Sequence, residues 1–412
     1  MSKFSRSPII LIVLLTLALL AMSAGCAAAA RSQPSAATGK TGTDLPAAAG
    51  ATAAGQLVER YVPRYAKGFH IEYYAGGARI IDTQIAATAN TAAVAQRVLI
   101  LPAGAPLPVN TTWDHRIDGY PDRVVTLASS HAGHFANLDA IGRVAGTSIK
   151  AENCFIPALK TALQNGAARY VGTGAKVDQE LIAALKPQII FVGGMQSDVE
   201  MAQKLAESGL FCFYFGDFAE NDYLGRAQWI ELIGACIGLD QQSRDYITAS
   251  AAQIQAILAR TGRLDTHPKV LWLTHSSSAP HWNVRTNQDY VNSIVTAVGG
   301  QLYFPPEATA NSLSLSNEAF IPYLRGADRI IFGVSLNSYP EAKNATYFNK
   351  EGQVDFASAP AVQSGNCYVV GYDWAQDTAD ALGIIQSMAI CLYPDEFKDL
   401  VNPGKIIPFQ VK

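Results

Sequence analysis

The sequence predicts an α/β protein of two βαβ lobes with mostly parallel sheets, joined by a long rigid helix and preceded by a small N-terminal β region. Short apolar runs alternate with helical patterns in two separate blocks of the chain, which is typical of βαβ units. Between the blocks, residues 225–262 show helical spacing and no strand pattern. Such a connector is stiff, so we expect only small movements of one lobe relative to the other.

The N-terminus has the features of a signal peptide, at residues 1–25. Lys3 and Arg6 precede an uncharged apolar run at residues 9–22. This run is shorter than the roughly 20 residues needed to span a bilayer and matches the hydrophobic region of a signal peptide. The protein is therefore expected to be exported, to the periplasm or the outer face of the cytoplasmic membrane.

The segment after the signal peptide is expected to be a membrane tether. Cys26 follows small residues, as in the lipobox of bacterial lipoproteins, which predicts lipidation of Cys26. A lipobox usually has Leu where this sequence has Ser23, and cleavage by the ordinary signal peptidase is the alternative. Residues 26–55 are rich in Ala, Gly, Ser and Thr without any aromatic residue, so they cannot bury a core and form a flexible linker.

Residues 56–121 are expected to form a β-rich extension of the folded body. A Gly-Gly pair separates strand patterns at residues 69–74 and 78–83, which is a hairpin signal, and residues 96–101 supply a third strand. A polar and aromatic cluster at residues 113–116 is a further candidate site near the surface.

The N-terminal ligand-binding lobe is expected at residues 122–224 and the C-terminal lobe at residues 263–412. In the first, strand patterns lie at residues 123–128, 144–147, 188–192 and 210–215, with helical patterns at 131–141, 178–185 and 198–208. In the second, strand patterns lie at residues 269–274, 329–333 and 366–370, with helical patterns at 287–298, 317–324 and 378–392.

Composition narrows the class of function. Without the two basic residues of the signal peptide, the 31 basic residues fall to 29 against 34 acidic ones, so nothing favours a nucleic-acid partner. We find no Walker loop, HExxH, GxSxG or CxxC motif, and we do not expect an enzyme. One disulfide is possible among the cysteines beyond Cys26, namely Cys154, Cys212, Cys236, Cys367 and Cys391.

Four segments carry a family resemblance. They are RVVTLASS from Arg123, GRVAGTS from Gly142, VGTGAKVDQELIAALKPQIIF from Val171, and PHWNVR from Pro280 with a following helix that ends in VGG. Together they resemble the periplasmic-binding-protein family of ABC importers for ferric siderophores, haem and cobalamin. The resemblance implies two lobes joined by a long helix, a ligand between them, and delivery of that ligand to an ABC permease dimer with a cytoplasmic ATPase. We expect a monomer.

The resemblance also implies that one glutamate of each lobe docks on arginines of the permease. Glu180 matches the position in the first lobe, and Glu318 is its counterpart, although Glu318 lies farther from the following strand. The alternative for each is a solvated acidic residue that stabilises the first turn of a helix.

Candidate ligand-binding residues in the first lobe are His131 and His134. Ligands of parallel α/β sheets lie beyond the carboxyl ends of the strands, and these two imidazoles follow the first strand, three residues apart on one face of a helix. Imidazoles donate to carboxylates or bind metals, so both are possible axial ligands of a haem iron, although no metal site is assigned directly. The alternative is exposed or capping histidines.

The second lobe supplies His281, Trp282, Arg285 and Trp374, all expected in loops after strands. An indole beside a guanidinium suits a large, flat, anionic ligand. Each tryptophan taken singly is more often a core residue.

These residues favour an iron complex, a ferric siderophore or haem, as the transported ligand, with no cofactor of the protein's own. Cobalamin is the alternative, because a histidine could approach its cobalt. Two other classes are an envelope metallohydrolase that uses His131, His134 and an aspartate such as Asp114, and an envelope ligand sensor.

Overall fold

The computed structural model describes residues 53–87, 93–275, 282–333 and 354–409, which belong to one compact unit. The predicted signal peptide, Cys26 and His281 lie outside the described residues. No helix in the described part of the chain is long and apolar enough to cross a membrane. The α/β fold class with two lobes and mostly parallel sheets is confirmed.

The N-terminal region forms a five-stranded sheet in the order β1-β2-β3-β4-β5. The first four strands are antiparallel, and β5 is parallel to β4. The predicted hairpin is confirmed: Gly76 and Gly77, both at positive φ, turn β2 into β3. The strands are β1 (Leu57–Tyr61), β2 (Phe69–Tyr74), β3 (Arg79–Ile85), β4 (Val94–Leu101) and β5 (His115–Asp118).

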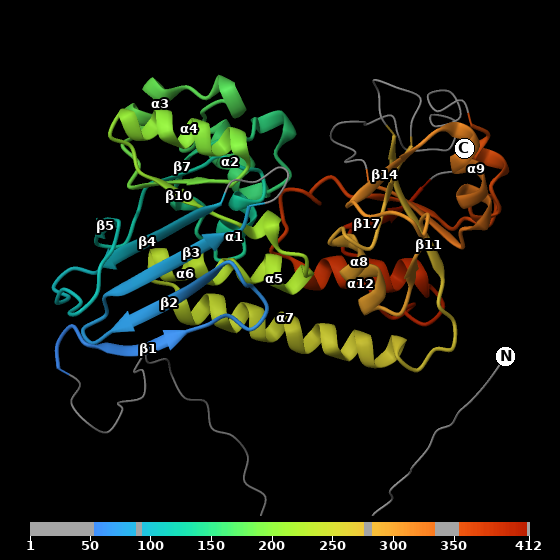
Figure 1. The fold of residues 1–412 in the computed structure, drawn as a ribbon, viewed down its shortest axis with the longest axis horizontal. Coiled ribbons are helices and arrows are strands. Elements are labelled where there is room, and N and C mark those ends of the chain that lie inside the picture. The colour runs from blue at the N-terminus through green and yellow to red at the C-terminus, as the bar shows by residue number, and fades with distance from the viewer. Residues whose placement is uncertain (1–52, 88–92, 276–281, 334–353, 410–412) are drawn as a thin grey trace, which may run out of the picture. The chain divides into compact units, whose positions relative to one another are not determined.

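The N-terminal lobe contains a parallel sheet in the order β10-β9-β6-β7-β8, with helices on both faces (Figure 1). Successive residues of β9 enter different cores: Phe191 packs in the core that contains α1, and Ile190 in the core that contains α3 and α4. The strands are β6 (Val124–Thr126), β7 (Val144–Thr147), β8 (Arg169–Tyr170), β9 (Ile189–Val192) and β10 (Cys212–Tyr214). The helices are α1 (His131–Ala136), α2 (Pro157–Gln164), α3 (Gln179–Leu185) and α4 (Gln196–Glu207).

Gln96 of β4 joins the N-terminal sheet to the outer edge of β10. Its side-chain carbonyl accepts a hydrogen bond from Tyr214 N (3.0 Å), and its amide donates to Cys212 O (2.9 Å). One side chain thus satisfies a donor and an acceptor of an edge strand that would otherwise lack a partner.

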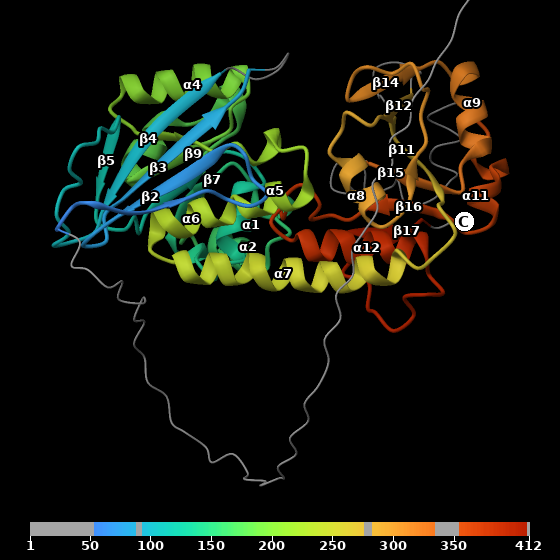
Figure 2. The same cartoon turned by 60° about the horizontal axis from the view of Figure 1, so that its bottom comes forward.

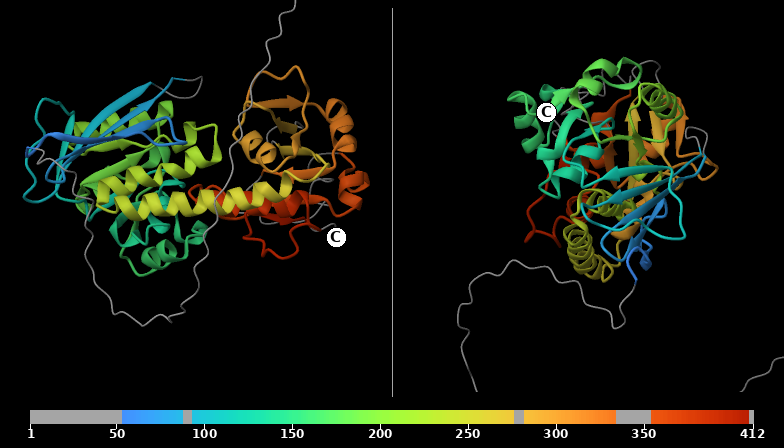
Figure 3. Two further views of the ribbon diagram at one scale, coloured as in Figure 1. Left: turned by 90° about the horizontal axis from the view of Figure 1, so that it is seen from below. Right: turned by 90° about the vertical axis from the view of Figure 1, so that its left-hand side faces the viewer.

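Three helices connect the lobes: α5 (Tyr223–Gln228), α6 (Ile230–Ile237) and α7 (Asp240–Thr261). The predicted segment without strands is confirmed, but Gly238, at a φ of 77°, ends α6, so the long helix begins later than expected. Buried residues of α7 recur every three or four positions, so one face of the helix is buried. They are Ser243, Ile247, Ser250, Ile254, Ile257 and Thr261. Figures 1 and 3 show α7 running along both lobes, and it contacts α5, α6 and α12 (Ala381–Leu392).

The C-terminal lobe contains a mixed sheet in the order β14-β12-β11-β15-β16-β17, with β13 beside β11 (Figure 2). β11, β13, β15 and β16 are parallel, whereas β12, β14 and β17 run antiparallel to their neighbours and were not predicted. The strands are β11 (Lys269–His275), β12 (Trp282–Arg285), β13 (Gln301–Leu302), β14 (Ser312–Leu315), β15 (Arg329–Phe332), β16 (Cys367–Val370) and β17 (Ile406–Pro408). The helices are α8 (Val291–Ala297), α9 (Asn317–Gly326), α11 (Pro360–Gln363) and α12 (Ala381–Leu392).

The five described cysteines, Cys154, Cys212, Cys236, Cys367 and Cys391, are buried and free. The possible disulfide is therefore absent among them. They act as small core residues, and burial raises the pKa of each thiol.

Candidate functional site

The segment that follows β16, residues 371–380, extends from the C-terminal lobe to the N-terminal lobe, and we call it the contact loop. It begins at the carboxyl end of β16, the end of a parallel strand where ligands of α/β sheets bind. Its residues contact the segments that follow β6, β7 and β10 of the other lobe. The candidate site is the region where these segments meet.

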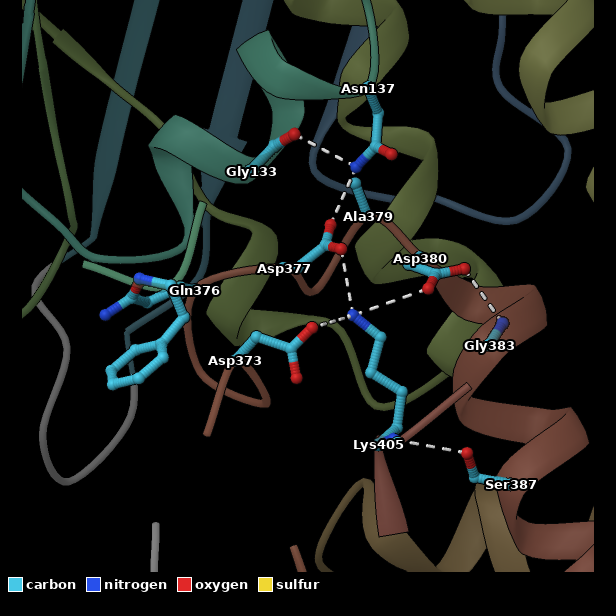
Figure 4. Close-up of polar contacts among 12 residues, drawn as sticks. Gly133, Asn137, Asp373, Gln376, Asp377, Ala379, Asp380, Gly383, Ser387 and Lys405 are labelled. Carbon is cyan, nitrogen blue, oxygen red and sulfur yellow. Dashed lines mark hydrogen bonds and ion pairs between the residues drawn. The ribbon is translucent and has the colours of Figure 1, made fainter. Parts of the chain in front are cut away.

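The contact loop packs directly on α1 (Figure 4). A side chain at Gly133 would place its Cβ 2.2 Å from the carbonyl oxygen of Gln376, so this contact requires glycine. One turn further on, the Asn137 amide donates both to Gly133 O (3.0 Å) and to Oδ1 of Asp377 (2.7 Å). The first helix of one lobe and the contact loop of the other are therefore held at van der Waals distance.

Gln376 links the contact loop to the segment after β7. Its side-chain carbonyl accepts from Phe155 N (2.9 Å), and its amide donates to Asn153 O (2.6 Å). The ring of Phe155 stacks on that of Tyr372, with 5.2 Å between centroids. Gln376 is buried, so losing it would leave two backbone groups without their partner.

Trp374, a predicted ligand-binding residue, lies in the contact loop and is half-buried. Its indole N–H donates to the hydroxyl of Tyr290 (2.8 Å), and the guanidinium of Arg226 lies over the Tyr290 ring, 3.7 Å from its centroid. Arg285 pairs with Asp289 (3.0 Å), the neighbour of Tyr290. We call Trp374, Tyr290, Arg226 and Arg285 the aromatic–cationic cluster. It brings together two flat aromatic rings and two guanidinium groups.

His131 and His134 are fully buried, so neither the predicted ligand-facing position nor the exposed alternative describes them. Both rings pack edge-on against Phe215, 4.9 Å between centroids. Their nitrogens form no well-aligned hydrogen bond with any described residue. They do not cap α1, and neither does Ser130. Ser129 instead donates to the contact loop at Ala375 O (3.2 Å).

Asp217, which sequence reasoning missed, is the carboxylate beside these histidines. Its Oδ2 lies 3.5 Å from Nε2 of His134 and accepts a hydrogen bond from Thr378 of the contact loop (3.1 Å). Burial alone would raise its pKa, but the interaction with His134 holds the pKa of Asp217 at about 2. Its position directly after β10, at the carboxyl end of a parallel strand, was the signal available in the sequence.

Burial lowers the pKa of His131 to about 4, and the charge of Asp217 offsets this only partly. The ring is therefore neutral at pH 7, the form that can bind a metal. Among the described residues, however, no group of three His, Cys, Asp or Glu side chains is arranged to hold a metal ion.

Trp282 is a core residue and not a ligand-facing one, which corrects the prediction. It lies on strand β12, with its ring fully buried and stacked on Phe320 (4.7 Å between centroids). Successive residues of a strand point to opposite faces, so Trp282 and Arg285, three positions apart, cannot present their side chains on the same face. Arg285 remains half-exposed.

Glu180 and Glu318 occupy equivalent places in the two lobes. Each is exposed and is the second residue of its helix, α3 or α9. The N-cap side chains, Asp178 and Ser316, both accept from the backbone N–H three residues on. Hydrogen bonds to the backbone and to Ser316 lower the pKa of Glu318.

The cluster at residues 113–116 has a structural role. His115 stacks on Phe211 at 3.6 Å between centroids, and Asp114 accepts from Arg97 N (2.7 Å). Asp114 thus belongs to the N-terminal sheet, and the carboxylate beside His134 is Asp217. The alternative arrangement, a metallohydrolase site of His131, His134 and Asp114, is not formed.

Comparisons with known proteins agree with this architecture. Residues 124–368, more than half of the chain, match the family model for periplasmic binding proteins. Two uncharacterised lipoproteins of Methanocaldococcus jannaschii are 24% and 22% identical over 58% and 67% of this chain. The matches span 61% and 66% of those lipoproteins, less than two thirds of each.

Solved structures share the fold at low identity. A siderophore-binding protein bound to two acinetobactin molecules and ferric iron has a TM-score of 0.55 and 16% identity, covering 76% of this chain and 98% of that chain. The periplasmic haem-binding protein of Vibrio cholerae has a TM-score of 0.53 and 19% identity, covering 66% and 99%.

We predict that replacing His131 by leucine makes the protein less sensitive to acid. An imidazole with a folded pKa of about 4 and an ordinary pKa of 6.5 gains a proton on unfolding between these values. Above pH 6.5 the ring is neutral in both states and burying it carries no protonation cost. As the pH falls toward 4 only the unfolded state gains the proton, so the free energy of unfolding falls by roughly 2–3 kcal/mol. Urea unfolding near pH 7 and near pH 4.5 measures the difference. The same change at the exposed His267 serves as the control, and an equal acid loss in wild type and His131→Leu would contradict the prediction.

Proposed function

The chain belongs to the periplasmic binding protein family, and on that premise we propose that it captures a small ligand between its lobes and delivers it to the permease of an ABC importer. The observation that carries the proposal is the aromatic–cationic cluster at the contact loop. Trp374 follows the parallel strand β16 and its indole donates to Tyr290. Arg226 lies over the Tyr290 ring and is held by the backbone oxygens of Glu220 and Phe218, and Arg285 pairs with Asp289, the neighbour of Tyr290. The role is binding and not catalysis.

The ligand class that this cluster suits best is an anionic iron complex, a ferric siderophore or haem. Flat ligands gain area on the rings, and carboxylate or catecholate oxygens accept from the rigid guanidinium fork. Proteins of the same fold bind haem or an iron–siderophore complex. His131 and His134 become axial ligands only if the segments around them move, because both rings are fully buried.

Ligand titration tests the function. Haemin, ferric enterobactin, ferric citrate and cyanocobalamin are added to the purified exported protein, and binding is followed by absorption and tryptophan fluorescence. We expect saturable binding of one iron complex, weakened about tenfold or more in Trp374→Leu because an aromatic anchor is lost. Trp113→Leu, in the N-terminal sheet, is the matched control. Binding of cyanocobalamin alone would redirect the assignment to corrinoids, and failure to bind any of the four would remove it.

Docking on the permease is proposed for Glu180 and Glu318, which are exposed at the second position of equivalent helices. Reversing both charges to arginine should abolish uptake, because each introduced guanidinium would meet a like-charged arginine of the permease, while leaving ligand affinity unchanged. Uptake of the radiolabelled ligand into cells is the measurement. The exposed pair Glu207 and Glu307, reversed in the same way, should retain uptake; retained uptake in the Glu180/Glu318 variant would exclude the docking role.

Attachment through a lipid on Cys26 completes the proposal. Its support is the lipobox-like sequence together with two related lipoproteins. Cys26→Ser should lose incorporation of labelled fatty acid and leave the membrane fraction. Labelling that persists in this variant would place the anchor elsewhere.

A further inference from the structure

Lys405, the residue before β17, is a buried cation that holds the contact loop (Figure 4). Its side chain is 3% exposed, and its Nζ lies 2.7 Å from Asp373, 2.8 Å from Asp377 and 3.4 Å from Asp380. All three carboxylates belong to the contact loop. One ammonium group therefore compensates three negative charges that the loop brings together.

The same charges connect the two lobes. Asp377 uses one carboxylate oxygen for Lys405 and the other for the Asn137 amide of α1. Asp380 also accepts from Gly383 N (2.8 Å) and so caps α12. A continuous path of contacts thus runs from β17 through Lys405 and Asp377 to the first helix of the N-terminal lobe.

The charge balance makes Lys405 essential to this arrangement. Burial alone would lower the pKa of the ammonium, but Asp377, Asp373 and Asp380 raise it above its ordinary value. Removing this buried cation from its partly exposed carboxylates costs more than removing an exposed pair, because the remaining charges lose their compensation. Without the ammonium, three carboxylates would repel one another within a loop of ten residues.

The sheet of the C-terminal lobe does not depend on this ammonium. β17 pairs with β16 through backbone hydrogen bonds, from Tyr368 to Val370 on one strand. Gly371 N donates to the backbone oxygen of Lys405 (2.8 Å), a bond that any residue at position 405 retains. The side chain thus acts on the contact loop more than on the strand that carries it.

We propose that Lys405 is a positioning residue for ligand capture: by compensating Asp373, Asp377 and Asp380 it holds the contact loop on α1, and so fixes the wall of the ligand site that carries Trp374. This inference rests on the proposed function and deepens it. Lys405 lies outside the ligand site but keeps that site ordered in the ligand-free protein. A site that is already ordered loses less conformational entropy when the ligand binds.

The test compares Lys405→Met with Lys398→Met in the full exported protein. Lys398 is exposed and pairs with Asp395 at 2.8 Å, so its loss removes a surface ion pair of the same kind. Hydrogen–deuterium exchange of residues 371–380 and affinity for the iron complex that binds in titration are measured for both. We expect Lys405→Met to exchange faster in the contact loop and to bind about tenfold more weakly or worse, with Lys398→Met unchanged.

A second pair of variants keeps the test open if Lys405→Met fails to fold. Gly133→Ala introduces a Cβ against Gln376 O without altering any charge, whereas a Cβ at Gly142, also in the N-terminal lobe, would meet nothing within 4 Å. Gly133→Ala should likewise speed exchange in the contact loop and weaken binding, and Gly142→Ala should do neither.

The possible results separate the role of Lys405 in holding the contact loop from its role in ligand capture. Faster exchange together with weaker binding supports the proposal, and faster exchange with unchanged affinity removes the role of Lys405 in capture. Exchange and affinity equal to the Lys398→Met control overturn it entirely. If the wild-type protein binds none of the four probes, the proposed function fails, while exchange in residues 371–380 still shows whether Lys405 holds the loop.

Discussion

The packing of the helical connector into a core shared by both lobes is the constraint on which the rest of the structure depends. One continuous cluster of buried residues includes Phe135 of the N-terminal lobe, Ile254 of α7 and Met388 of α12. Because α7 buries a single face along its length, its contacts with α6 and with α12 are fixed together. The carboxyl ends of two separate sheets can then face a common region.

The N-terminal sheet stabilises this connector through polar contacts. Glu220, buried just before α5, accepts hydrogen bonds through one oxygen from Lys67 N (2.8 Å), Gly68 N (3.0 Å) and the indole of Trp229 (3.1 Å). Asp240, the first residue of α7, pairs with Arg79 and accepts from Tyr73 (2.7 Å). A buried carboxylate with several donors is stable only if every partner stays in place, so the extension is part of the folded body.

The contact loop positions the residues of the candidate ligand site. Gly133 permits the close approach, Gln376 ties the loop to the segment after β7, and Lys405 compensates its carboxylates. We assign none of these three residues to the binding surface itself. Their common effect is to place Trp374 beside Tyr290 and Arg226, and order in such supporting residues is what keeps a binding surface precise.

Local pattern determined much of the architecture in advance. Strands at residues 144–147 and 269–274, the hairpin around Gly76, and the helical connector all follow from periodicity and turn chemistry, which act between near neighbours in sequence. The equivalence of Glu180 and Glu318 was expected from the family resemblance, and in the structure an N-cap residue precedes each of them by two positions. The antiparallel strands β12, β14 and β17 were missed, because strands of three or four residues carry little periodic signal.

The sequence by itself thus determined the fold class, the family resemblance and the placement of Trp374 after a strand. Only the tertiary structure decided which candidate side chains are buried: Trp282 entered the core because β12 pairs with β11, and His131 and His134 were enclosed against Phe215. It likewise brought Asp217 to His134, and Lys405 to Asp377. These pairings join residues distant in sequence, and periodicity reports only on the face a residue occupies, not on what covers that face.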